Sequence, residues 1–167
     1  MSILPVYATS FFASEKRPDG MQLVIRYEDG VVYTNMNLDA RFEGYKGILH
    51  GGMVFGILDV LIWYSILMET RKICMTRKTE MEFLKPVLCD TPYRAEARVV
   101  AVEERDIISF AWVQDEHGEH YAEVKAVFRE AKGLDVEQFV HSFDFSQGTP
   151  DMKEFFYSLI PGETVKY

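Results

Sequence analysis

A long apolar segment with one acidic residue constrains this chain more than any other feature. Residues 53–68 are almost entirely apolar apart from Asp59, and the run is too long for a single strand. It is short for a membrane-spanning helix and contains a carboxylate, so it predicts a buried core helix from about Gly51 to Thr70. A helix that is apolar all round must be covered on all sides, and a curved antiparallel sheet wrapped around it would do so.

Strand-like segments lie on both sides of this helix. Met21–Tyr27 and Val31–Leu38 precede it and flank a Glu-Asp-Gly turn typical of a hairpin. Four more follow it at regular spacing with polar turns: Ile73–Leu84, Tyr93–Glu103, Ile107–Gln114 and His120–Arg129. This order predicts an α+β fold with an antiparallel meander.

The domain plan expected from this order is simple. Residues 1–130 form one domain with an irregular lead-in over residues 1–19, which is a usual size for a single core. Residues 131–167 form a partly helical C-terminal extension. Within it, Thr149 is the expected N-cap and Pro150 the first helical residue.

Composition excludes several classes of protein. The net charge of −8 argues against general nucleic-acid binding, and no membrane association is expected. The chain has two cysteines in no metal-like spacing and no signal-peptide pattern at its start, so a reducing cytoplasm fits best. His117 and His120 flank a turn without further ligands, and no metal site is expected.

Two interpretations of Asp59 remain open from the residues alone. A buried carboxylate costs several kcal/mol, roughly, unless it is paired, so Asp59 is either a hydrogen-bonded structural acid or a general base or nucleophile tuned by burial. His50, Gly51 and Gly52 at the helix start favour the second interpretation. Glycines there let a ligand approach free backbone N–H groups, which can hold the negative charge that develops on an attacked carbonyl.

These residues resemble a known family. Residues 50–59 (His-Gly-Gly-Met-Val-Phe-Gly-Ile-Leu-Asp) are similar to the His-Gly-Gly…Asp signature of the phenylacetyl-CoA-type acyl-CoA thioesterases, which have the hotdog fold. Residues 41–47 resemble the lead-in of one branch, and Thr76 with residues 83–86 resembles the strand that follows. The Asp115–Gly118 turn resembles the final hairpin. The resemblance implies a hotdog domain: a curved antiparallel sheet around a long central helix.

The resemblance also implies roles. Asp59 would activate a water or attack the thioester carbonyl, the Gly51 amide would polarise that carbonyl, and Thr76 would orient the water. His50 would support the loop and the thioester end. The implied substrate-binding residues are Gly52, Gly47, Arg77 and Lys85, the last two toward CoA phosphates. Trp63 and Tyr64 are bulkier than the residues common in relatives, so they either narrow an acyl pocket or fill the core.

The expected function is hydrolysis of an acyl-CoA thioester, with no cofactor other than the coenzyme A of the substrate. The implied site lies between chains, so a homodimer or a dimer of dimers is expected. Two other functions stay open: a hotdog protein that binds acyl-CoA without cleaving it, and a hydroxyacyl-thioester dehydratase or hydratase.

Overall fold

The computed structural model describes residues 1–162, and their contacts divide the chain into two compact units. A central unit consists of Gly30–Glu130. The second unit combines Met1–Asp29 with the chain from Ala131 onward, so the two ends of the sequence fold together. The N-terminal lead-in and the C-terminal extension therefore belong to one compact unit.

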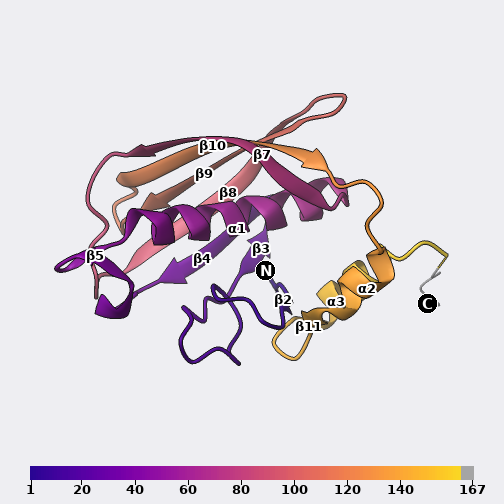
Figure 1. Ribbon diagram of the computed structural model, residues 1–167, viewed down its shortest axis with the longest axis horizontal. Coiled ribbons are helices and arrows are strands. Elements are labelled where there is room, and N and C mark those ends of the chain that lie inside the picture. The colour runs from indigo at the N-terminus through magenta and orange to yellow at the C-terminus, as the bar shows by residue number, and fades with distance from the viewer. Residues whose placement is uncertain (163–167) are drawn as a thin grey trace. The chain divides into compact units, whose positions relative to one another are not determined.

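The central unit contains an antiparallel sheet and one long helix (Figure 1). Its sheet has the order β4-β8-β9-β10-β7, so β7 lies at an edge. The elements of the sheet and helix are β4 (Val31–Met36), α1 (Gly51–Thr70), β7 (Cys74–Phe83), β8 (Tyr93–Val102), β9 (Ile107–Gln114) and β10 (His120–Glu130). Between β4 and α1 lie η1 (Ala40–Phe42), β5 (Glu43–Tyr45) and β6 (Ile48–Leu49).

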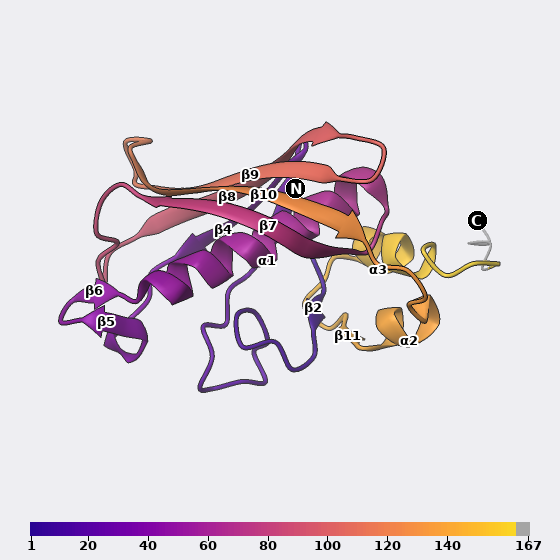
Figure 2. The same ribbon diagram turned by 45° about the horizontal axis from the view of Figure 1, so that its top comes forward.

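Small side chains let α1 lie close to the inner face of this sheet. In β8, Ala95 and Ala97 are fully buried, whereas Arg94 and Glu96 alternate with them and point to the other face. Ala111 of β9 and Ala126 of β10 continue the inner layer. The two views show α1 running along the concave side of β7 to β10 (Figures 1 and 2).

α1 is a core helix with one partly exposed face. It is long and apolar enough to span a membrane, yet the nine residues that it buries lie in this folded core. They are Val54, Ile57, Leu58, Leu61, Ile62, Tyr64, Ser65, Ile66 and Leu67. The helix ends at Arg71, which adopts a left-handed conformation with φ of 58° and donates its N–H to Leu67 O.

The second unit is held together by short strands and aromatic packing. Its elements are β1 (Ser2–Ile3), β2 (Val6–Tyr7), β3 (Arg26–Glu28), α2 (Val136–His141), β11 (Phe143–Asp144) and α3 (Pro150–Tyr157). β1 pairs with β3, and β2 pairs with β11. Phe156 is fully buried and packs against Phe143 and Phe145, with ring centroids 4.9 and 5.9 Å away.

The sequence misplaced some of these elements. The strand expected from Met21 begins only at Arg26, because the N–H groups of Met21 and Leu23 bond to the carbonyls of Phe11 and Phe12. The expected helix in the tail is α3. Thr149 is its N-cap residue, but the hydroxyl bonds to the backbone of Ile3 instead of the helix.

Candidate active site

The first residue of the His-Gly-Gly motif caps α1. His50 has an extended backbone, and its imidazole Nδ1 accepts the Gly52 N–H at 2.9 Å. The carbonyl of His50 accepts the N–H groups of Met53 and Val54. Within residues 1–162, the Gly51 N–H is left with no acceptor. The cap therefore leaves one backbone donor, that of Gly51, at the positive end of the helix dipole.

Glycines surround the His50 ring closely. A Cβ on Gly52 would lie 3.0 Å from Nδ1, and one on Gly44 would lie 3.1 Å from both Cα and Cδ2 of His50. Both positions need glycine if the imidazole is to keep its capping position. Because Nδ1 accepts a hydrogen bond, the neutral ring carries its proton on Nε2, and the exposed side of the ring presents a donor.

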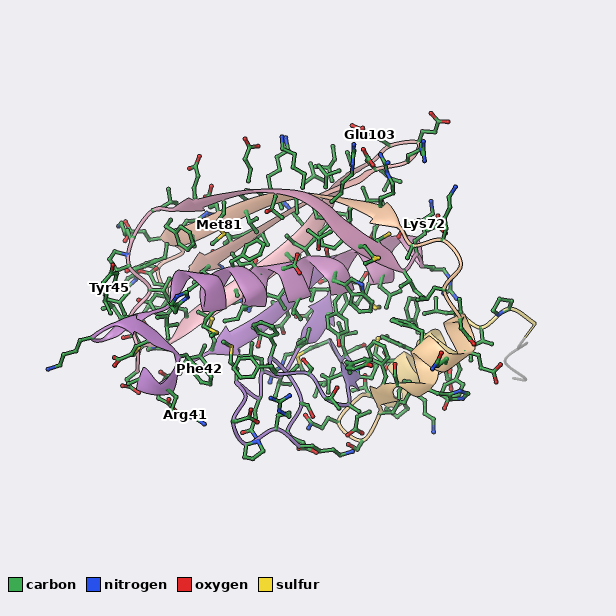
Figure 3. The ribbon with its side chains drawn as sticks, viewed as in Figure 1. Arg41, Phe42, Tyr45, Lys72, Met81 and Glu103 are labelled. Atoms are coloured by element: carbon green, nitrogen blue, oxygen red, sulfur yellow. The ribbon has the colours of Figure 1, made fainter. Side chains whose placement is uncertain are left out.

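Phe83 marks the space next to the free amide. A Cβ on Gly51 would lie 3.1 Å from the Phe83 Cζ, so the ring of this residue at the end of β7 lies against the helix start. Phe83 is nevertheless 57% exposed, and its neighbour Leu84 is also exposed. On the same strand, Met81 lies between β7 and α1, and Tyr45 projects from β5 at the same end of the unit (Figure 3). Exposed apolar groups thus collect beside the Gly51 amide.

Asp59 is tied to β7 by Thr76. The Thr76 hydroxyl donates to Asp59 Oδ1 at 2.9 Å. Burial raises the pKa of the Asp59 carboxyl above its usual value, and the Thr76 hydrogen bond opposes that rise. A half-buried carboxylate with one hydroxyl donor and a raised pKa has the properties of a general base or a nucleophile.

Gly51 and Asp59 cannot act on the same atom within one chain. Eight residues separate them on α1, which is about 12 Å along the axis at about 1.5 Å per residue. Each chain therefore carries a free amide at the start of α1 and, more than two turns further along, a carboxylate.

The other predicted binding residues have partners elsewhere in the chain. Gly47 forms the β5–β6 turn with φ of 77°, and its carbonyl accepts the Cys89 N–H. Arg77 bonds to Asp106 at 2.8 Å and borders a cavity of about 400 Å³ that also includes Lys78. Lys85 forms an ion pair with Glu119. Arg77 and Lys85 are more than a third exposed, so both cations remain accessible to an anion.

Two other features lie apart from these residues. A cavity of about 660 Å³ is lined by the end of β4, the start of β8 and the β9–β10 turn, and none of the predicted site residues borders it. His120 bonds to Glu123 at 2.6 Å, and His117 is exposed beside Glu116. Across residues 1–162, no cluster of three or more His, Cys, Asp or Glu side chains forms a metal site.

The structure brings together Asp59 with Thr76, and His50 with Gly51 and Gly52. Sequence reasoning did not place Phe83 beside the helix start. The structure does so, and it also shows that this aromatic side chain is largely exposed. The resemblance already included the residue in the motif of β7.

Comparisons with known proteins identify relatives of this fold. Residues 46–110 match the model of the Thioesterase superfamily. A thioesterase superfamily protein of known structure aligns with a TM-score of 0.67 and 19% identity over 71% of this chain and 62% of its own. This chain therefore spans less than two thirds of that relative. No curated protein matches at a significant level.

Two bacterial structures extend the comparison. The Escherichia coli PaaI protein of the phenylacetic acid degradation operon aligns with a TM-score of 0.61 and 16% identity, covering 68% of this chain and 83% of its own. A Streptococcus mutans protein bound to acetyl-CoA has a TM-score of 0.60 and 16% identity, covering 65% and 88%.

The fold and the arrangement of α1 within its sheet define a hotdog domain, as the sequence predicted. Within that fold, the family match and the phenylacetic-acid-related neighbours confirm the resemblance to the hotdog-fold thioesterase superfamily.

Proposed function

We propose that the protein hydrolyses an acyl-CoA thioester at a site shared by two chains. The observation that carries this proposal is the half-buried Asp59 carboxylate, held by Thr76 on an otherwise apolar helix. The unpartnered Gly51 N–H at the start of the same helix supports it. Two of the solved relatives, from Streptococcus mutans and Streptococcus pneumoniae, hold acetyl-CoA and coenzyme A respectively.

In the proposed reaction, the Gly51 amide of one chain holds the thioester oxygen while Asp59 of the other acts at the carbonyl carbon. As a general base, Asp59 removes a proton from water, the new C–O bond forms, and the C–S bond breaks to release the CoA thiolate. As a nucleophile, Asp59 forms an acyl anhydride that water then cleaves. Thr76 orients the carboxylate in both routes, and the Nε2–H of His50 faces the leaving group.

The edge strand β7 suits the pairing that this reaction needs. If two β7 strands pair antiparallel about an axis at Glu80, Lys78 lies opposite Glu82 of the partner subunit, on the outer face. Between Thr76 and Lys78 the register with β10 shifts, which leaves Arg77 as an extra residue. Because Arg77 is skipped, Thr76 would lie opposite the partner subunit's Phe83 in this pairing. Thr76 contacts Asp59 and Phe83 lies against Gly51, so Asp59 would come to lie beside the partner subunit's Gly51.

The direct test is a screen of the purified protein against acetyl-, butyryl-, octanoyl- and phenylacetyl-CoA, with thiol release as the readout. Hydrolysis that disappears in Asp59→Asn supports the proposal. Binding of these compounds without thiol release identifies a non-catalytic binder, and hydration of crotonyl-CoA identifies a hydratase. Either result rejects thioester hydrolysis. In the active protein, oxygen-18 from water appears in Asp59 after repeated turnovers only by the nucleophilic route.

A further inference from the structure

Trp63 lies one helical turn beyond Asp59 on the same face of α1. Both side chains reach β7. The Thr76 hydroxyl donates to Asp59, and the Trp63 indole Nε1–H donates to the Cys74 carbonyl at 3.1 Å. Two contacts therefore join α1 to β7 in parallel, two residues apart on the strand. The indole therefore lies one turn beyond the carboxylate along the side of α1 that faces β7.

Buried residues neighbour Trp63 on both α1 and β7. Cys74 is buried, and Ile66 in the next turn of α1 is fully buried. Tyr64 packs edge-on against Trp63 with ring centroids 4.9 Å apart, so the indole cannot swing away easily. The ring of Trp63 is therefore held by a hydrogen bond on one side and by an aromatic contact on the other.

The opposite end of the shared site is open. It would be formed by the start of α1 in the other chain, where His50, Phe83 and Leu84 are exposed. The CoA part of a thioester carries phosphates and must reach solvent, so it has to leave by this open end. The acyl group then points along α1 toward Trp63.

We propose that Trp63 forms the end wall of the acyl pocket and restricts the enzyme to short, compact acyl groups. This inference rests on the proposed function, because it takes Asp59 as the residue at the thioester carbonyl. Trp63 acts on substrate choice by occupying volume, while its hydrogen bond to Cys74 holds the ring in place.

The test compares Trp63→Leu with the wild type on butyryl-CoA and octanoyl-CoA. The ratio of kcat/KM for octanoyl over butyryl should rise at least tenfold, since one methylene in an apolar pocket already changes kcat/KM by roughly tenfold or more. Trp63→Phe, which removes only part of the volume, should give a smaller rise of about threefold. Trp112→Leu is the matched control, because Trp112 lies on the outer face of β9, and its ratio should stay at the wild-type value.

Two further measurements keep the outcomes separate. If Trp63→Leu does not fold, as judged by circular dichroism, the Trp63→Phe ratio decides. If the wild type hydrolyses no thioester, calorimetric binding of the same two compounds replaces turnover. A shift in the preference for octanoyl-CoA over butyryl-CoA then supports Trp63 as the end wall even if no thioester is hydrolysed. An unchanged octanoyl-to-butyryl ratio in a folded Trp63 variant overturns the proposal.

Discussion

His50 caps the N-terminus of α1 through Gly52 and Met53. Its Nδ1 accepts the Gly52 N–H at 2.9 Å, and its carbonyl accepts the N–H of Met53. The same side chain thus stabilises α1 and leaves the Gly51 N–H as the free donor. His50 thus combines a structural role with a proposed catalytic role, and substitutions can separate the two.

His50→Asn and His50→Ala separate these roles. Asparagine is a strong N-cap and should retain the stability of α1, whereas alanine should lower the free energy of unfolding by about 1 kcal/mol. Both remove the Nε2 donor, so both should lower kcat for thioester cleavage. Urea unfolding and steady-state kinetics check the two effects. Equal free energies of unfolding for His50→Asn and His50→Ala would show that the side-chain cap does not stabilise α1.

Gly51→Pro tests the amide without removing the helix. Proline is favoured at the first helical position, and the extended backbone of His50 (φ −60°, ψ 129°) allows a proline to follow it. The substitution removes the N–H proposed to hold the thioester oxygen, so kcat should fall by roughly 10²–10³-fold.

Gly51→Ala is the control for that variant. Its Cβ meets the same Phe83 ring at 3.1 Å but keeps the N–H. Activity in Gly51→Ala should therefore exceed that in Gly51→Pro by at least tenfold. Similar losses in the two variants would assign the effect to crowding by Phe83 and not to the amide.

Thr76→Val should move the pH dependence of the reaction. The Thr76 hydroxyl stabilises the ionised form of Asp59 and so opposes the rise in pKa that burial causes. Without this donor the pKa of Asp59 rises further, and the acidic limb of the kcat/KM profile should shift to higher pH. The rate at the plateau should fall roughly tenfold as the carboxylate loses its orientation. An unshifted limb would show that the hydroxyl does not contact the ionised form.

Asp59→Asn should stabilise the fold at neutral pH. The folded-state pKa of Asp59 is raised, so folding favours the protonated carboxyl. Its contribution is favourable below the unfolded-state pKa and is lost as pH rises through the folded-state value. Chemical unfolding at pH 7 should therefore give a larger free energy for Asp59→Asn than for the wild type. The gap should shrink as pH falls toward the unfolded-state pKa. A gap that is constant with pH would contradict the raised pKa.

Charge exchange across β7 tests the proposed dimer. In Lys78→Glu, the introduced carboxylate of each chain would face Glu82 of the partner subunit, and symmetry gives two such repulsive pairs. The dimer dissociation constant should therefore rise roughly tenfold. Adding Glu82→Lys restores opposite charges and should restore both dimerisation and activity. Sedimentation velocity measures the first and thiol release the second. A double variant that stays monomeric would exclude this register.

The helices and strands that the sequence predicted well are those in which apolar residues form a long run or alternate regularly with polar ones. α1 and strands β8 to β10 were expected within a residue or two, because long apolar or alternating segments define their own limits. β2 and β11 were not expected, since two residues carry no period and their pairing depends on a partner far along the chain. β5 and β6 lie in a segment assigned as loop for the same reason.

The candidate site divides in a similar way. Four of its residues lie in one short motif: His50, Gly51, Gly52 and Asp59. The resemblance added Thr76 as the residue that would orient the water, and the structure shows its hydrogen bond to Asp59. The roles of Phe83 and Trp63 depend on which groups the fold places against them. Only the folded structure reveals that Phe83 lies against Gly51 and that the Trp63 indole donates to the Cys74 carbonyl.

The pairing of β2 with β11 has a consequence for synthesis on the ribosome. Val6 is synthesised long before its strand partner Asp144. The β2 strand must therefore wait for its partner, whereas residues 30–130, which form a compact unit, can fold earlier. A ribosome stalled after residue 130 has left its exit tunnel should carry a folded hotdog core while β2 still lacks its partner strand.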